Sequence, residues 1–466
     1  MAGRSTSRRS FLKLAASSTV AAGFATSALA GSRTQLLTAE PLKPVSPNDR
    51  IRIASIGMGI IAYSDVNTAL RVPGVEFVAA ADLYDSRLVR VKEVYGDHIF
   101  TTRDYREILA RPDIDAVIVA TPDHWHKQIA VDAMEAGKHV YLEKPMVHRV
   151  EEGPEVIAAQ ERTGRVLQVG SQFASSLIFA KAQELFEAGA IGRLNMIEAS
   201  YNRNSSLGAW QYSIPPDASP ETVDWDTFLG NAPKRPFDAV RFFRWRNYSD
   251  YGTGVAGDLF VHLFTGIHRA ISAKGPTEIY AVGGIRKWKD GRDAPDVMLG
   301  LYQYPETDKH PDFTLALQTN FAHGGGGGTV FRFIGDEGAM SIEGGTLRLS
   351  RRPMRPPTEQ QLVEGYNSVF TFSEEVQRQF VEQYRREHPT SPPAELDESI
   401  EYRVPQGYDD RLDHFADFFA GIREGKPVVE GPVFGYRAAA PPLLANLSYE
   451  TRRPYAWDPD GMKLLS

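Results

Sequence analysis

The chain has 466 residues, of which 42% are hydrophobic and 24% charged, so it is long enough and apolar enough to form two folded domains. It contains no cysteine, which excludes disulfides, thiolate metal ligands and cysteine nucleophiles. Its net charge of −7 argues against nucleic acid or an anionic membrane surface as a partner.

Residues 1–30 have the pattern of a twin-arginine export signal. Arg8 and Arg9 precede a short apolar stretch rich in Ala and Ser, and residues 28–30 (Ala-Leu-Ala) form a small-residue cleavage site. The stretch is shorter than the roughly 20 residues of a membrane helix, so we expect no anchor after cleavage. Cleavage would remove four basic residues and no acid, taking the net charge from −7 to −11. These features predict a periplasmic or secreted protein delivered by the twin-arginine machinery, with a disordered basic tail as the alternative.

The first domain is expected to follow a Pro-containing linker at 31–48. A strand at 51–56 runs directly into residues 57–62 (Gly-Met-Gly-Ile-Ile-Ala), a dinucleotide-binding fingerprint with Ala at its third small position. Its glycines allow a tight turn and close approach of a pyrophosphate, which the following helix N-terminus favours. We therefore expect four residues to contact a bound dinucleotide: Gly57, Met58, Gly59 and Ile60.

Asp82 stands where the ribose-binding acid of this fingerprint belongs. It ends a second apolar strand, 75–81, about twenty residues past the glycines. A carboxylate here accepts both ribose hydroxyls and repels a 2′-phosphate, so NAD is expected and NADP is less favoured. The alternative is that Asp82 only caps a helix or a turn.

Further strands at 116–120, 139–142 and 166–168 alternate with helical stretches, a pattern that predicts a doubly wound parallel sheet. We assign residues 49–170 to this Rossmann domain. Because twin-arginine export carries proteins that are already folded, its NAD would have to travel with the protein.

Two motifs in this domain, Thr121 to His126 and Gly137 to Pro145 with its Glu-Lys-Pro ending, resemble those of the Gfo/Idh/MocA oxidoreductases. These nicotinamide-dependent enzymes are related to glucose–fructose oxidoreductase and inositol dehydrogenase. The resemblance covers nearly everything after residue 49. It implies an α/β protein whose second, α+β domain (171–466) has an open, mostly antiparallel sheet that forms the substrate pocket. It also implies further cofactor-binding residues: Thr121, Pro122, His124, His126, Glu143 and Lys144.

Three residues are candidates for catalysis. Lys144 follows a strand at the sheet edge where such folds bind ligands, and its ammonium can lower the pKa of a substrate hydroxyl. Asp258 and His262 are four residues apart in a predicted helix over 257–273, so both can face one cleft. The resemblance implies that His262 takes the hydroxyl proton and that Asp258 positions the substrate or the histidine. Family members often have an acid three residues past this histidine, where the present sequence has Thr265. The alternative for Asp258 and His262 is that they belong to an ordinary helix without a catalytic role.

Weaker candidates for the substrate pocket are Gln172, Tyr201, Arg244 and Trp245, since aromatic faces and polar groups suit a sugar. Residues 324–328 are predicted to form a mobile hairpin tip. Residues 350–407, rich in Pro and Arg, are predicted to be a mostly irregular insertion that covers a site or an interface. No metal site is predicted, because His124 and His126 have no third ligand at a recognisable spacing.

Together these features predict an exported, NAD-binding oxidoreductase that transfers a hydride from a sugar or polyol hydroxyl and keeps its cofactor tightly bound. One alternative is a glycosidase that oxidises, eliminates, adds water and reduces again with the same NAD. Another is a sugar-binding protein without activity. We also expect a homo-oligomer, as open sheets in the family commonly pair subunits.

Overall fold

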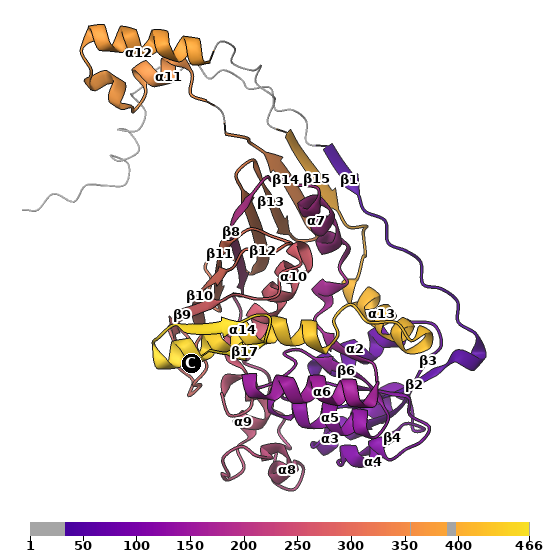
Figure 1. Cartoon of the computed structure of the whole chain (residues 1–466). Coiled ribbons are helices and arrows are strands. Elements are labelled where there is room, and N and C mark those ends of the chain that lie inside the picture. Colours follow the sequence, from indigo (N-terminus) through magenta and orange to yellow (C-terminus); the bar gives the residue numbers. More distant parts are fainter. Residues whose placement is uncertain (1–32, 355, 389–397, 466) are drawn as a thin grey trace, which may run out of the picture.

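The computed structural model describes residues 33–354, 356–388 and 398–465, so the predicted export signal lies outside the described residues. Their strands form one parallel sheet and one larger mixed sheet, and helices lie between the two (Figure 1). None of the helices in these residues is long and apolar enough to cross a membrane.

The first sheet has the strand order β4-β3-β2-β5-β6-β7 and is parallel throughout. Its strands are β2 (Ile51–Ile56), β3 (Val75–Ala81), β4 (Phe100–Thr102), β5 (Ala116–Val119), β6 (His139–Glu143) and β7 (Leu167–Gly170). The central strands are buried on both faces, as expected for a sheet covered by helices on both sides. The helices are α2 (Ile60–Ala69), α3 (Asp85–Tyr95), α4 (Tyr105–Leu109), α5 (His126–Glu135) and α6 (Gly153–Thr163). The strand order reverses between β2 and β5, which places the ligand crevice at their carboxyl ends.

The proposed boundary at residue 170 is wrong for one segment. Helix α13 (Asp410–Glu424) packs against α2 and β7 of the first domain. Its Phe415, Phe418 and Phe419 are buried in the same core as Ile53. The helix itself is predictable from its sequence, but which sheet it covers is decided by contacts with residues far away in the sequence.

The second sheet has eleven strands among the described residues, in the order β1-β15-β14-β13-β12-β8-β11-β10-β9-β16-β17. In chain order they are β1 (Arg33–Leu36), β8 (Leu194–Asn202), β9 (Glu278–Gly284), β10 (Val297–Tyr304), β11 (Phe313–Asn320), β12 (Gly328–Gly335), β13 (Gly338–Glu343), β14 (Thr346–Arg351), β15 (Glu398–Arg403), β16 (Tyr455–Asp458) and β17 (Lys463–Leu464). Within the described part of the chain, only the β1–β15 and β8–β11 pairs of this sheet are parallel, so the predicted open, mostly antiparallel sheet is confirmed. Strand β1 lies within the predicted linker, and its four residues give little sequence signal.

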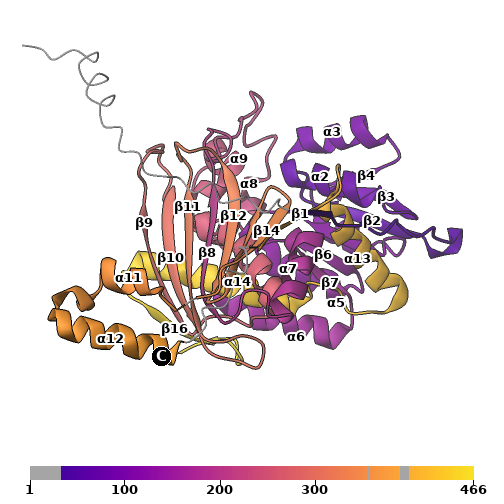
Figure 2. The same ribbon diagram turned by 90° about the horizontal axis from the view of Figure 1, so that it is seen from above.

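Helices cover one face of this sheet. They are α7 (Leu177–Glu187), α10 (Val261–Ile271) and α14 (Pro432–Thr451), on the side toward the first domain (Figure 2). Two short helices, α8 (Trp225–Leu229) and α9 (Ala239–Phe243), lie in the loop region beside the first domain. Burial alternates residue by residue along β9, β10 and β11, so the opposite face of these strands is exposed.

Residues 324–328 are not a hairpin tip. Strands β11 and β12, which they connect, both pair with β8 but on opposite sides of it. The glycine run therefore crosses over the end of β8. A Cβ at Gly327 would lie 3.2 Å from the carbonyl oxygen of Asn202, so the crossing chain passes close to that strand end.

The predicted irregular insertion at 350–407 is also wrong as described. It contains α11 (Glu359–Glu364), α12 (Glu374–Glu387) and strand β15. Thr358 and Gln361 form a capping box at the start of α11, a local signal that the Pro and Arg content obscured. Figure 1 shows α11 and α12 at the opposite end of the molecule from the first sheet, so they do not cover the ligand crevice.

Candidate functional site

A cavity of about 350 Å³ lies where the carboxyl ends of the first sheet meet the second domain. It is lined from both domains, by the fingerprint glycines and Lys144 of the first and by Asp258 and His262 of the second. Of the residues predicted from the sequence, the lining includes Gly57, Gly59, Ile60, Asp82, Thr121, Pro122, Glu143, Lys144, Gln172, Tyr201, Trp245, Asp258 and His262. The cavity therefore joins the two predicted sites into one.

The fingerprint end fits a dinucleotide. Gly57 has φ of 91°, and a Cβ there would lie 2.6 Å from the carbonyl oxygen of Ala120, so only glycine is accommodated. Gly59 has no atom within 4 Å of the position of a Cβ, which leaves the backbone open to a pyrophosphate. Helix α2 starts at Ile60 without a side-chain cap, so its first N–H groups are available to an anion. Thr121 Oγ1 is buried and has no hydrogen-bond partner among the described residues, so a ligand can supply one.

Asp82 is held in place by the backbone. The N–H of Met58 donates to Asp82 Oδ2 at 2.7 Å, and the N–H of Tyr84 donates to Oδ1 at 3.0 Å. Arg87 lies 3.3 Å from the same carboxylate. The side chain of Met58 is buried and does not line the cavity, so its contribution is the backbone N–H that orients Asp82.

The two predicted cofactor histidines, His124 and His126, do not line the cavity. His124 lies with Nε2 2.8 Å from the carbonyl oxygen of Phe228, and burial lowers its pKa to about 4. The ring nitrogens of His126 lie 2.7 and 3.0 Å from the carbonyl oxygens of Pro145 and Thr121. Both rings therefore connect loops behind the cavity wall, which a motif in the sequence does not distinguish from contact with a ligand.

Lys144 and Asp258 form a buried ion pair. The Lys144 ammonium donates to Asp258 Oδ1 at 2.8 Å and to the Asp258 carbonyl oxygen at 3.0 Å, with the two side chains 12% and 10% exposed. The predicted helix over 257–273 begins as a π-helix, Ala256–Phe260, before α10. A Cβ at Gly257 would lie 2.1 Å from Thr253, so glycine is required for this turn to pack. The π-helix places Asp258 against Lys144, an arrangement often found at functional sites.

The charges around Asp258 decide the protonation of its neighbours. Burial alone raises the pKa of Asp258, but the cations Lys144, Arg246 and Arg203 outweigh it and hold the pKa far below its ordinary value. Burial, followed by the positive charge of Lys144, lowers the pKa of His262 well below 6.5. The site therefore holds an ionised aspartate beside a neutral histidine that can accept a proton.

Phe173 and Tyr201 enclose the ring of His262, with ring centroids 5.8 and 5.9 Å away. Its Nδ1 is buried and has no hydrogen-bond partner among the described residues. Asp258 was expected to position the substrate or the histidine, but it does not hydrogen-bond to His262 in the structure. Its hydrogen bond to Lys144 instead supports a role in positioning the lysine.

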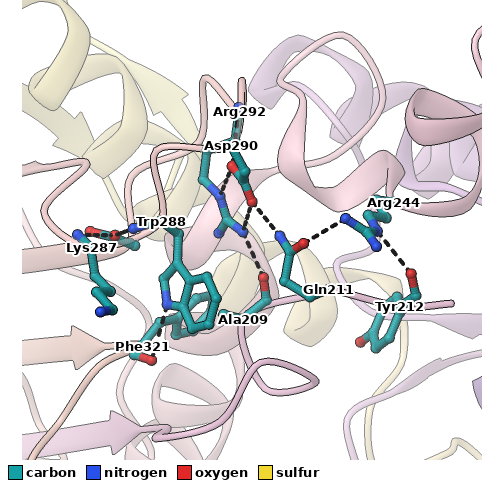
Figure 3. Close-up of polar contacts among 10 residues, drawn as sticks. Ala209, Gln211, Tyr212, Arg244, Lys287, Trp288, Asp290, Arg292 and Phe321 are labelled. Atoms are coloured by element: carbon teal, nitrogen blue, oxygen red, sulfur yellow. Dashed lines mark hydrogen bonds and ion pairs between the residues drawn. The ribbon is translucent and has the colours of Figure 1, made fainter.

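Arg244, predicted for the substrate pocket, points elsewhere. It donates to the carbonyl oxygen of Tyr212 at 2.8 Å and to Gln211 Oε1 at 2.5 Å (Figure 3). Gln211 in turn donates to Asp290, which is paired with the buried Arg292 at 2.8 Å. This network fixes the segment that brings Tyr212 into the cavity wall. Arg244 thus supports the pocket without lining it.

Several lining residues were not predicted as site residues, among them Phe173, Tyr212 and Arg411, whereas Arg203 and Arg246 were only weak candidates within their segments. Arg203 and Arg246 lie beside predicted residues, but in short turns the sequence does not show which neighbour points inward. Arg411 comes from α13, whose place against the first domain had no local signal.

The first domain is similar to a known family. Residues 51–171 match the model of the Gfo/Idh/MocA family, an oxidoreductase family with an NAD-binding Rossmann fold. The matched residues include every strand of the first sheet. The match ends close to β7, the last strand of the first sheet.

The curated relatives are matched over a limited part of their length. A glycosyl hydrolase family 109 protein of Shewanella baltica (strain OS185) is 37% identical over 174 residues, 34% of this chain and 37% of the relative. An α-N-acetylgalactosaminidase of Shewanella oneidensis is 37% identical over 121 residues, 24% of this chain and 26% of the relative. Among solved structures, levoglucosan dehydrogenase in complex with NADH and L-sorbose superposes with a TM-score of 0.63 at 18% identity, covering 87% of this chain and 98% of that one. That likeness shows that both domains share its fold.

Proposed function

We propose that the protein oxidises a hydroxyl group of a sugar or polyol with NAD held in its first domain. The single observation that carries the proposal is the shared cavity, which Lys144, Asp258 and His262 line together with the dinucleotide-binding glycines. Sugar ligands in the solved neighbour, L-sorbose among them, support the substrate class.

Bound NAD would supply the acceptor for the hydride. The chain's own residues prepare the hydroxyl. Lys144 has three N–H donors and gives two of them to Asp258, which leaves one for the substrate oxygen. The positive charge of Lys144 lowers the pKa of that hydroxyl, and neutral His262 accepts its proton. Ionised Asp258 holds the lysine side chain in position throughout.

A second candidate is a glycosidase that uses the same NAD transiently, by oxidation, elimination, addition of water and reduction. It is supported by the glycosyl hydrolase family 109 protein and the α-N-acetylgalactosaminidase among the relatives. The same three residues would remove the first proton in either reaction. A third candidate, a sugar-binding protein without activity, has no specific observation in its favour.

The test uses purified protein without added NAD, offered free sugars and chromogenic glycosides including an N-acetylgalactosaminide. We expect the NADH absorbance band to appear with a free sugar, whereas release of chromophore without lasting NADH selects the glycosidase.

Lys144→Ala and His262→Ala should each lower turnover by about 10²–10⁴-fold while keeping the fold and the cofactor. Lys127→Ala, which removes a lysine outside the cavity paired with Glu155, is the matched control. Unchanged turnover in either active-site variant would refute the role of that residue. Neither NADH formation nor chromophore release with any substrate would favour the sugar-binding protein without activity.

We further propose that the protein is exported through its N-terminal segment and keeps its NAD bound. The support is the pattern of Arg8, Arg9 and residues 28–30, together with the scarcity of free NAD outside the cytosol. Residues 1–48 fused to a reporter should carry it out of the cytosol, and Arg8→Lys with Arg9→Lys should retain it. Export of the doubly substituted fusion would contradict this assignment, and loss of the nucleotide on dialysis would contradict tight binding.

A homo-oligomer is the third part of the proposal. It is supported by apolar side chains on the exposed face of the second sheet, where Tyr280 opposes Leu301 and Val282 opposes Leu299 across β9 and β10. Contiguous exposed apolar surface of this kind is typical of protein–protein contacts.

A further inference from the structure

The substrate end of the cavity carries more positive than negative charge. Lys144, Arg203 and Arg246 line the cavity together with Asp258, and all three lower the pKa of that carboxyl. Glu143 also lines the cavity, and Asp65 is buried nearby with Arg411 3.9 Å away; burial raises the pKa of both carboxyl groups, which favours their neutral forms. The cations beside Asp258 are therefore incompletely balanced by protein groups.

Arg246 is a cation of the cavity whose two terminal nitrogens are both free of hydrogen-bond partners among the described residues. Its Nε lies 3.4 Å from Asp258 Oδ1, a long contact for an ion pair, and neither Nη atom has a hydrogen-bond partner in the described part of the chain. The guanidinium carbon lies 4.2 Å from the ring centre of Trp245, so stacking fixes its plane. A guanidinium held in this way presents a planar fork that matches two carboxylate oxygens.

Arg203 adds a second donor nearby. It donates through Nη1 to the carbonyl oxygen of Gly208 at 2.9 Å and lies over the ring of Tyr201 at 5.4 Å. Its Nε and Nη2 have no partner among the residues that the structure describes. Two arginines with spare donors at one end of a half-buried cavity are costly without a counter-ion, because unpaired charges lose solvation.

We propose that the substrate is a sugar that carries a carboxylate, a uronic acid or a uronoside, and that Arg246 binds this carboxylate. This rests on the proposed function and names the substrate class of the same site. A neutral sugar would leave the fork of Arg246 unpaired, whereas a uronate fills it and neutralises the excess charge beside Lys144. The hydroxyl to be oxidised then lies on the same ring as the carboxylate that orients it.

The test compares glucose derivatives that differ in the group at C6 and in its charge. Binding of a methyl glucuronoside, its neutral methyl ester, the parent methyl glucoside and glucose 6-phosphate is followed by tryptophan fluorescence and by the shift in Tm of the purified protein with its cofactor. Fluorescence is a suitable readout because Trp245 lies under Arg246. We expect the acid to bind at least about 10-fold more tightly than its ester or the glucoside, as expected for a charge-assisted hydrogen-bonded pair. Because this comparison uses the wild-type protein, its result does not depend on whether a variant folds.

Two substitutions locate the effect. Arg246→Gln should reduce the preference for acid over ester to less than about 3-fold, and Arg246→Lys should keep part of it. The matched control is Arg241→Gln, because Arg241 also lies over an aromatic ring, Tyr248 at 4.1 Å, and contacts an aspartate, Asp250 at 3.2 Å, but it is outside the cavity lining. It should keep the full preference.

Equal binding of acid and ester, tighter binding of the phosphate, or an intact preference in Arg246→Gln would each overturn the proposal. The absorbance of bound NADH separates this result from the proposed function. Acid-selective binding without NADH formation would support the uronate ligand and contradict the proposed oxidation. NADH formation from neutral sugars, without a preference for the acid, would support the oxidation and contradict the uronate ligand.

Discussion

Burial of His262 determines the pH at which it can work. Its pKa is lowered below 6.5 by burial and by the charge of Lys144, so the neutral form persists as the pH falls through that value. The pKa of Asp258 is also lowered, so this carboxylate stays ionised over the same range. Both groups therefore keep their working protonation state in mildly acidic solution.

We predict that the acid limb of the kcat/KM profile lies below pH 6.5. Activity should fall only as the pH drops through the lowered pKa of His262, because the protonated ring cannot accept the hydroxyl proton. Phe173→Ala, which opens one side of the ring enclosure, should move this limb upward toward 6.5. A wild-type limb at or above 6.5 would contradict the role of neutral His262.

Helix α13 shows that an element can belong to one domain by sequence position and to another by packing. It comes after the whole second sheet except β16 and β17, yet it closes one face of the first sheet. Tyr141 of β6 stacks on Phe415 with ring centroids 4.1 Å apart. The first domain thus depends on residues from near the end of the chain.

Phe418→Ala in α13 should destabilise the first domain. Phe418 is fully buried near Tyr141, and truncation of a core phenylalanine costs about 3–5 kcal/mol of unfolding free energy. The measurement is the denaturant midpoint in the presence and absence of NAD. Phe370→Ala, at a side chain 78% exposed, is the control and should change stability by no more than about 0.5 kcal/mol. Equal midpoints for the two variants would show that α13 is dispensable.

The whole molecule has one sheet covered by helices on a single face. The exposed face carries Tyr280, Val282, Leu299 and Leu301, the last 54% exposed. The residues alternate along β9 and β10, so all four lie on the same side. Such a surface is expected to be covered by a second copy of the chain.

We predict that the wild-type protein is oligomeric at micromolar concentration and that Leu301→Asp shifts it toward monomer. A carboxylate placed in the contact would lose its hydration without gaining a partner. Sedimentation velocity measures the change, with Val376→Asp on α12, at a side chain 45% exposed, as control. A monomeric wild-type protein, or an unchanged oligomer in Leu301→Asp, would remove this face as the interface.

The sequence by itself determined the features that depend on a few neighbouring residues. The turn at Gly57, the acid at the end of β3 and Lys144 at the end of β6 follow from local backbone geometry and strand periodicity. For the same reason the parallel first sheet was predictable, whereas the mostly antiparallel second sheet was expected only from the family resemblance. The spacing of Asp258 and His262 likewise indicated that they face one cavity, although not that Asp258 pairs with Lys144.

Only the tertiary structure decided the features that depend on contacts between distant segments. Packing selected Arg246 over Arg244 as the arginine of the cavity, placed α13 under the first sheet and turned His124 and His126 toward backbone carbonyls. Tertiary packing also determines that residues 324–328 cross over the end of β8 and that β1 pairs with β15. Each of these choices is made by burial and by hydrogen-bond partners far along the chain, and a local pattern of residues carries no information about which distant surface will supply them.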